Sequence, residues 1–150
     1  MKSPARYVVA GVFLLIASIV NYGCDWLLGV HFELFYGITD FNMLWILDLF
    51  VVPALVGFLI AVVYGFGAKW IAILVPLVQH TYAYSQFSYL ADLHRLPQGA
   101  VLQPMGWWGF FVIVAMEVAM LGAIFGESVI KKTYGRRPRH LVFKQKPSSK

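Results

Sequence analysis

Residues 107–130, WWGFFVIVAMEVAMLGAIFGESVI, are apolar apart from Glu117, Glu127 and Ser128. A helix that crosses a bilayer needs about 20 mostly apolar residues, because each residue adds about 1.5 Å along the helix axis. Three further stretches have a similar length and character, at residues 7–28, 44–66 and 70–90. The chain is therefore predicted to be an all-α membrane protein that forms a four-helix transmembrane bundle.

The composition supports the same class. Hydrophobic residues make up 60% of the chain and charged residues 13%, whereas a typical soluble domain has about 25% charged residues. The chain therefore has too few polar side chains to cover the hydrophobic core of a soluble domain. We predict one four-span domain at residues 1–130, followed by a basic tail at residues 131–150. This division leaves no room for a soluble catalytic domain.

The cations are distributed unevenly around the four stretches. Eight of the twelve Lys and Arg residues follow Ile130, two precede the first stretch, and Lys69 lies between the second and third. Only Arg95 lies on the other side. The positive-inside rule predicts that both termini are cytoplasmic, as an even number of spans requires. For a prokaryotic protein, this predicts a multi-pass protein of the inner, cytoplasmic membrane.

The basic tail favours a membrane surface as its partner. Clustered cations bind the phosphates of nucleic acid, but beside a transmembrane domain they more simply bind anionic lipid headgroups. We therefore expect contact with membrane lipids and no nucleic acid. Glu127 lies four residues before Lys131 and is expected to form an ion pair with it at the end of the helix.

Two ionisable residues lie near the middle of predicted spans. His80 in the third stretch and Glu117 in the fourth are at similar depth, with Gln79 beside His80. A charge in hydrocarbon is costly, so such residues indicate a functional site, and a His80–Glu117 pair would lower the cost of burying both. Two alternatives remain: His80 satisfies a carbonyl group that Pro76 leaves free, or Glu117 meets a helix of another subunit.

A second polar layer is expected about 10 Å further outward. It contains Asp25 of the first stretch and Asp48 of the second, and Asn21 shares a helix face with Asp25. Two carboxyl groups close together share a proton, so this layer is the candidate outer part of a proton relay. The alternative is that both carboxyl groups are partly hydrated near the interface.

Small residues and prolines predict how the helices pack. In lipid, helices associate by close approach over small side chains. The small residues recur at Gly57, Ala61 and Gly65 in the second stretch, and at Ala115, Ala119, Gly122 and Gly126 in the fourth. These positions fit either packing within the bundle or docking onto a partner. Pro53 and Pro76 predict kinks, because proline cannot donate a helical hydrogen bond.

No cofactor or metal is expected. A haem held between two helices needs two intramembrane histidines, and only His80 qualifies. A zinc site needs three or four ligands. The outer loops could supply ligands only if they converge, and the candidates are His31, Glu33, Asp92 and His94. Cys24 is the only cysteine, so a redox pair of cysteines is excluded.

Three functions fit these features. The first is a non-enzymatic subunit or accessory factor of a larger membrane complex, which contacts protein partners or further copies of itself through the small-residue positions and Glu117. The second is a proton-coupled small transporter or channel that uses His80 and Glu117. The third is an intramembrane enzyme that modifies a lipid or quinone, with Asp48, His80 or Glu117 as general acid or base. The sequence favours the first.

Overall fold

The computed structural model describes residues 4–37 and 41–134. Helices dominate, and one short antiparallel ladder joins two loops. In chain order the elements are α1 (Pro4–Leu28), β1 (Leu34–Phe35), α2 (Met43–Ile46), the π-helical turn η2 (Leu47–Val51), α3 (Val52–Tyr64), α4 (Lys69–Ala72), α5 (Leu74–Asp92), β2 (Val101–Leu102) and α6 (Met105–Tyr134). The predicted all-α class is confirmed, while the ladder of two residue pairs was not predicted.

Within the described residues, three helical stretches are long and apolar enough to cross a membrane. They are Tyr7–Leu28, Met43–Tyr64 and Met105–Thr133, which correspond to three of the four predicted spans. Their length and composition indicate a multi-pass membrane protein. The remaining predicted span, 70–90, is helical but interrupted at Ile73 and rich in polar residues, so it does not meet the same criterion. The interruption agrees with the predicted effect of Pro76, which has no N–H group for the carbonyl of Ala72.

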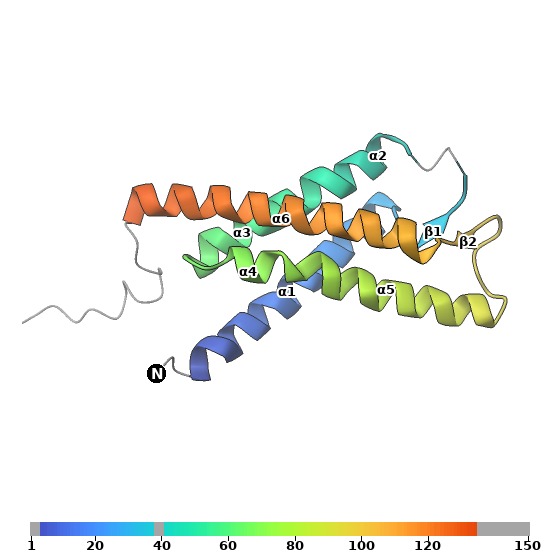
Figure 1. The fold of residues 1–150 in the computed structure, drawn as a ribbon, viewed down its shortest axis with the longest axis horizontal. Coiled ribbons are helices and arrows are strands. Elements are labelled where there is room, and N and C mark those ends of the chain that lie inside the picture. Colours follow the sequence, from blue (N-terminus) through green and yellow to red (C-terminus); the bar gives the residue numbers. More distant parts are fainter. Residues whose placement is uncertain (1–3, 38–40, 135–150) are drawn as a thin grey trace, which may run out of the picture.

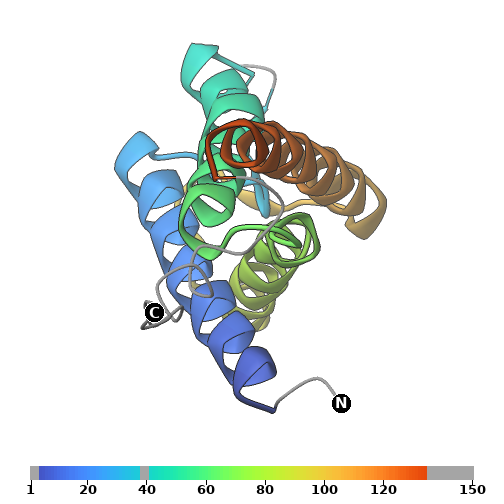
Figure 2. The ribbon, with the colours of Figure 1, turned by 90° about the vertical axis from the view of Figure 1, so that its left-hand side faces the viewer.

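The long helices form a bundle with two distinct ends (Figure 1). The start of α1, the turn between α3 and α4 and the end of α6 lie at one end, which we call the turn end. The β1–β2 ladder and the end of α5 lie at the other, the ladder end. Seen from the turn end, α1 crosses the other helices obliquely (Figure 2). The basic tail predicted for residues 131–150 begins within α6, and its part beyond residue 134 lies outside the described residues.

Helices α3 and α6 pack with their backbones nearly touching. A Cβ atom added to Gly57 would lie 2.0 Å from the carbonyl oxygen of Ala119, and one added to Gly122 would lie 2.1 Å from that of Ala54. A Cβ atom on Gly126 would lie 2.7 Å from the Cβ of Ala61. Side chains larger than hydrogen therefore do not fit at these glycines. This contact supplies the close-approach attraction that holds helices together in lipid.

The same contact decides between the two interpretations of the small residues. Ala61, Ala115 and Ala119 are completely buried within the chain. Gly65 has a different role, because it ends α3 at a positive φ of 87°. Ala119, Gly122 and Gly126 of α6 therefore face α3, and Ala115 packs with Phe32 and Leu49. These positions are not available to dock a partner, which corrects the expectation that a partner binds there.

At the turn end, Glu127 of α6 holds the turn that leads into α4. Its Oε1 accepts hydrogen bonds from the backbone N–H groups of Gly67 (3.0 Å) and Lys69 (3.1 Å). Glu127 was expected to form an ion pair with Lys131 at the helix end. Its hydrogen bonds instead tie α6 to the α3–α4 turn and satisfy amides that have no helical partner.

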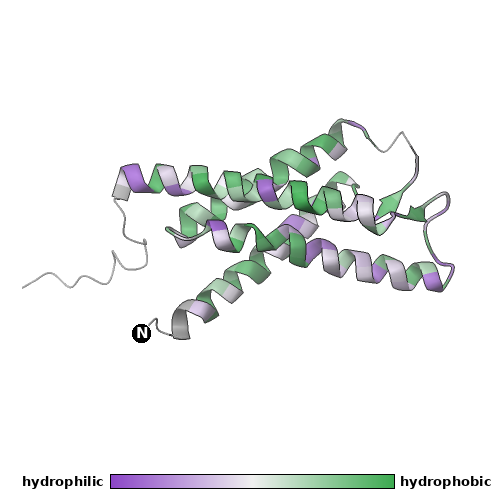
Figure 3. Cartoon of the chain, in the orientation of Figure 1, coloured by the Kyte–Doolittle hydropathy of each residue, from purple (hydrophilic) through white to green (hydrophobic). Residues whose placement is uncertain are grey.

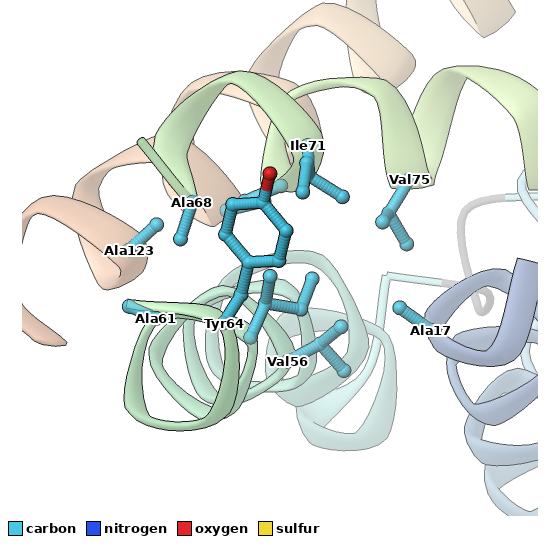
Figure 4. Close-up of a cluster of buried hydrophobic side chains, with 11 residues drawn as sticks. Ala17, Val56, Ala61, Tyr64, Ala68, Ile71, Val75 and Ala123 are labelled. Carbon is cyan, nitrogen blue, oxygen red and sulfur yellow. The ribbon is translucent and has the colours of Figure 1, made fainter. Parts of the chain in front are cut away.

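An apolar core fills the turn end of the bundle (Figure 4). Tyr64 of α3 lies at its centre, and its ring meets that of Phe13 edge to face at 5.7 Å. The buried members of this turn-end core are Ala17, Val56, Ile60, Ala61, Tyr64, Ala68, Ile71, Ala72, Val75, Ala119 and Ala123. Alanine is the most frequent residue in the list, so the helices approach closely here.

The helix that continues from α2 into α3 contains one wide turn. In η2 the N–H of Val52 donates to the carbonyl of Leu47, five residues earlier, instead of the usual four. Pro53 follows immediately and has no N–H to donate, so the kink predicted there takes the form of a π turn. The wide turn carries Asp48, whose side chain is directed into the protein and is buried.

After α1 the chain turns back into the bundle. Gly29 has a φ of 68°, and the N–H of Val30 donates to the carbonyl of Asp25 at 3.0 Å, so α1 ends in a tight reversal. The residues that follow fold inward, and Val30, Phe32, Glu33 and Leu34 are buried. We call residues 29–35 the inserted segment.

The inserted segment is held by apolar burial and by the ladder. Val30, Phe32 and Leu34 each expose 6% or less of their surface. Leu34 pairs with Leu102 across the β1–β2 ladder, and the N–H of Gln103 donates to the carbonyl of Glu33 at 2.8 Å. Leaving three large apolar side chains in water would be costly, so the segment folds inward. Because Glu33 lies between Phe32 and Leu34, its side chain is placed inside the bundle as well.

Candidate functional site

Six polar side chains meet inside the bundle, near the ladder end, and none exposes more than 5% of its surface. They come from α1, the inserted segment, the π turn and α5. We call this group the buried polar cluster, and its members are Asn21, Asp25, Glu33, Asp48, Gln79 and His80. Buried groups of this kind are rare unless they are paired or have a function.

Gln79 connects α5 to α1. Its amide nitrogen donates a short hydrogen bond to Oδ2 of Asp25. Its amide oxygen accepts from Nδ2 of Asn21 at 2.5 Å. Asn21 and Asp25 are four residues apart and therefore lie on one face of α1, where a single glutamine reaches both.

His80 connects α5 to the inserted segment. Its Nδ1 lies 2.9 Å from Oε1 of Glu33, and the two side chains expose 1% and 2% of their surface. The amide nitrogen of Gln79 lies 3.3 Å from the same Nδ1. A ring nitrogen either donates one hydrogen or accepts one. Either Nδ1 donates to an ionised Glu33, or a protonated Glu33 donates to Nδ1. The two arrangements differ by the transfer of one proton.

Some polar atoms of the buried polar cluster have no hydrogen-bond partner among the described residues. Among the described residues, neither oxygen of the Asp48 carboxyl group has a hydrogen-bond partner by geometry. The same is true of the Nε2 atom of His80. Asp48 nevertheless lies within hydrogen-bonding reach of the Asp25 carboxyl group and close enough to Glu33 to interact with its charge. The cluster thus contains three acids and one base. Uncompensated charge is costly in a buried site, so neutrality requires protons on the carboxyl groups.

Apolar side chains close the cluster on both sides. Toward the ladder end, the ring of Phe32 lies 5.1 Å from that of His80, and Phe32 packs with Leu49 and Phe111. Toward the turn end, Ala17, Val56 and Val75 of the turn-end core follow. This surround excludes bulk water and strengthens every electrostatic interaction inside it.

His31 precedes the cluster but does not belong to it. Its ring lies 5.3 Å from that of Phe87. Burial lowers the pKa of His31, and the nearby charge of Glu33 partly opposes this effect. Within residues 4–37 and 41–134, no group of three or more His, Cys, Asp or Glu side chains has the geometry to hold a metal ion. Glu33 turns toward His80 and so does not join the other loop residues considered as zinc ligands.

The structure corrects the expected partner of His80. Glu117 is exposed on the outer face of α6, and His80 contacts Glu33 instead. The reason is that α6 presents its small residues to α3, which turns the opposite face, with Glu117, away from the bundle. The residues adjoining Glu33 carried the missing signal: Val30, Phe32 and Leu34 are too apolar for a hydrated loop.

The two predicted polar layers form one cluster. Asp25 and Asp48 were placed about 10 Å outward of His80 by counting residues along parallel helices. In the structure Gln79 contacts both Asp25 and His80. The oblique course of α1 (Figure 2) and the π turn that carries Asp48 change the depths that simple counting assigns.

No protein-family model, curated protein or solved structure matches this chain in the three comparisons made. The cluster is therefore interpreted from its own geometry.

Proposed function

We propose that this chain is a small proton-conducting membrane protein, a channel or proton-coupled carrier, in which the buried polar cluster binds and releases protons. One observation carries the proposal: three carboxyl groups and one imidazole are enclosed together, with Nδ1 of His80 2.9 Å from Oε1 of Glu33. Ionisable groups are costly inside a membrane protein, so a group of four indicates a functional site.

The Glu33–His80 pair supplies a step for proton movement. At 2.9 Å, a proton passes between Oε1 and Nδ1 without large motion of either side chain. Nε2 on the far side of the ring is the second nitrogen that takes up a proton, and it would receive or release the next one. Imidazole is suited to this role because its ordinary pKa of about 6.5 lies near neutral pH. Asp48 and Asp25 extend the path on the α1 side.

The elements at the two ends would act as gates. At the ladder end, the inserted segment carries Glu33 and is held by the two-pair ladder to β2. At the turn end, Val75 lies beside the break at Ile73, where α4 and α5 meet. Helix breaks and π turns are common at functional sites because they allow local motion. Alternate opening at the two ends would admit water to the cluster from one side at a time.

The proposal includes the membrane arrangement expected from the sequence. Helix α5 has 19 residues and a length of about 28 Å, enough to span the hydrocarbon core as the fourth span. Its low hydropathy arises partly from Gln79 and His80, which are directed into the bundle and away from lipid. The turn end, with most of the cations, would then be cytoplasmic, in the inner membrane of a prokaryotic cell.

A second candidate function rests on Glu117. This carboxyl group lies on an exposed face of α6, near the middle of a helix long enough to cross the membrane. A membrane partner that covers it would make the chain a subunit or accessory factor of a larger complex. The two candidates are compatible, because the buried polar cluster lies inside the bundle and Glu117 lies on the exposed side of α6.

Proton conduction is tested in liposomes that contain the purified chain. A potassium gradient with valinomycin sets the membrane potential, and an internal pH dye reports proton entry. We expect Glu33→Gln and Asp48→Asn to reduce the initial rate by about ten-fold or more, because each removes a titratable group and keeps its size. Glu117→Gln is the matched control and is expected to conduct at the wild-type rate.

Infrared spectroscopy separates proton binding from conduction. Protonated carboxyl groups in the wild-type protein give C=O stretching bands, and Asp48→Asn should remove one of them. Wild-type liposomes without proton flux would contradict conduction. Loss of flux in Glu117→Gln with full flux in Glu33→Gln would place the path outside the cluster.

A further inference from the structure

A pocket of about 240 Å³ lies at the turn end, between α6 and the segment that joins α3 to α4. Its lining residues come from both elements and are Phe66, Lys69, Ile124, Glu127, Ser128 and Lys131. The four on α6 are spaced three and four residues apart, so they share one helix face. The last turns of α6 are hydrophilic, whereas most of the preceding turns are hydrophobic (Figure 3). The pocket therefore lies where charged and apolar parts of the helix meet.

Two lysines supply the positive charge of this pocket. Lys69 is half-buried at the start of α4, and Lys131 is exposed near the end of α6. Within residues 4–37 and 41–134, neither ammonium group forms an ion pair with a carboxyl group. The ammonium group of Lys69 lies 5.5 Å from the centre of the Trp70 ring. An aromatic ring attracts a cation but does not cancel its charge, so both charges remain available to an anion.

The other polar side chains of the pocket are engaged elsewhere. Oε1 of Glu127 accepts hydrogen bonds from the backbone N–H groups of Gly67 (3.0 Å) and Lys69 (3.1 Å), so these amides compensate part of its negative charge. The hydroxyl group of Ser128 donates to the carbonyl of Ile124 at 2.8 Å and is therefore not a donor toward the pocket. Recognition of a ligand would depend on the two lysine ammonium groups.

Exposed apolar side chains adjoin the two lysines. In the pocket itself, Phe66 exposes 56% of its surface and Ile124 exposes 40%. Phe125 follows Ile124 on α6 and is 66% exposed, as is Trp70 beside Lys69. Tryptophan rings prefer the headgroup level of a bilayer, so Trp70 places this pocket at the boundary between hydrocarbon and headgroups. A ligand that carries both a negative charge and a hydrocarbon chain matches these surroundings, whereas a soluble anion would leave the apolar side chains uncovered.

We propose that this pocket binds an anionic phospholipid, with its phosphodiester group between Lys69 and Lys131 and its acyl chains beside Phe66 and Ile124. The inference rests on the proposed membrane arrangement, which places the turn end at the bilayer surface, and it does not depend on proton conduction. Basic pockets between helices on the cytoplasmic side of a membrane suit such headgroups. Phosphatidylglycerol fits because its headgroup carries no charge besides the phosphodiester. A zwitterionic lipid would bring its own ammonium group toward the two lysines.

The first test measures the lipid that the full-length chain retains. The protein is reconstituted in nanodiscs of phosphatidylcholine with a minority of phosphatidylglycerol, and native mass spectrometry counts the lipids that stay bound after transfer to detergent. We expect Lys69→Gln and Lys131→Gln each to lower the retention of phosphatidylglycerol by about five-fold, which is the effect of one cation at an anionic membrane surface. Lys69→Arg keeps the charge and should retain the lipid as the wild type does.

Lys132→Gln is the matched control. It removes the same charge from the next residue of α6, which is exposed but does not line the pocket. We expect it to retain phosphatidylglycerol almost as well as the wild type. Equal losses in Lys131→Gln and Lys132→Gln would show a diffuse attraction to the basic end of the helix and would overturn the site. A parallel preparation with phosphatidylethanolamine in place of phosphatidylglycerol should show no selective retention, and equal retention of the two lipids would also overturn the proposal.

A competition experiment separates a lipid from a soluble anion. Excess inorganic phosphate should leave phosphatidylglycerol bound to the wild type, as should sodium chloride at the same ionic strength. Displacement by phosphate but not by chloride would assign the pocket to a soluble phosphate and overturn the lipid proposal. A chain that conducts protons without selective retention of phosphatidylglycerol would overturn only this inference. Selective retention in liposomes without proton flux would contradict only the proposed function.

Discussion

Glu33 and His80 are 47 residues apart in the chain, yet Oε1 of Glu33 lies 2.9 Å from Nδ1 of His80 in the interior of the bundle. Glu33 belongs to no helix. It is brought to His80 by the inserted segment, whose apolar residues bury themselves against the helices. The pair therefore ties a connecting segment to a buried imidazole on α5.

Breaking this pair should destabilise the protein. We expect His80→Leu to lower the free energy of unfolding by about 3 kcal/mol, because it leaves the Glu33 carboxyl group buried without its partner. The double variant Glu33→Leu/His80→Leu should recover a large part of that loss, since neither polar group remains. Reversible unfolding by steric trapping in bilayers provides the measurement. Additive effects of the two substitutions would show that the side chains do not interact in the folded state.

The α3–α6 contact should tolerate no side chain at Gly57. We expect Gly57→Ala to destabilise the fold by about 1–3 kcal/mol, because the new Cβ would lie 2.0 Å from the carbonyl oxygen of Ala119 and must push the helices apart. Gly11→Ala on α1 is the matched control. No atom lies within 4 Å of its added Cβ, so it should be neutral or slightly stabilising. Equal unfolding free energies for the two variants would contradict the observed contact.

Glu127 should protect the α3–α4 turn. Glu127→Ala removes the acceptor of the Gly67 and Lys69 amides, so we expect a loss of about 1–2 kcal/mol of stability and faster hydrogen exchange at these two amides. Ser128→Ala is the control, because its hydroxyl group donates only to Ile124 on its own helix. Unchanged exchange at Gly67 in Glu127→Ala would mean that another group holds the turn.

Acidification should weaken the packing around His31. Burial lowers the pKa of His31 in the folded protein, while the unfolded chain keeps the ordinary value of about 6.5. Between these values the unfolded chain binds more protons, so stability falls as the pH drops through about 6.5 and levels off below the lowered pKa. We expect the thermal midpoint of the wild type to fall more than that of His31→Gln between about pH 7.5 and 5.5. An identical fall in the two proteins would assign the pH dependence to other groups.

The sequence identified those members of the buried polar cluster whose positions follow from residue spacing along a single helix. Asn21 and Asp25 share a face of α1, and Gln79 adjoins His80, so four members of the cluster were identified by spacing and depth. Asp48 was identified as well, although its inward direction depends on the π turn. The pairing of His80 was wrong, because depth alone does not determine which way Glu117 is directed around the axis of α6.

Hydropathy is a local property, so the amino-acid order alone was sufficient to predict the break near Pro76 and the three apolar helices that the structure contains, although a fourth apolar span was predicted at residues 70–90. Which face of a helix is buried against another helix is not a local property of the sequence. The close contact of α3 with α6 turned Glu117 outward, and the inward fold of residues 29–35 brought Glu33 to His80. Those two outcomes depend on which faces minimise exposed apolar area when all the helices pack together, and only the assembled bundle determines that.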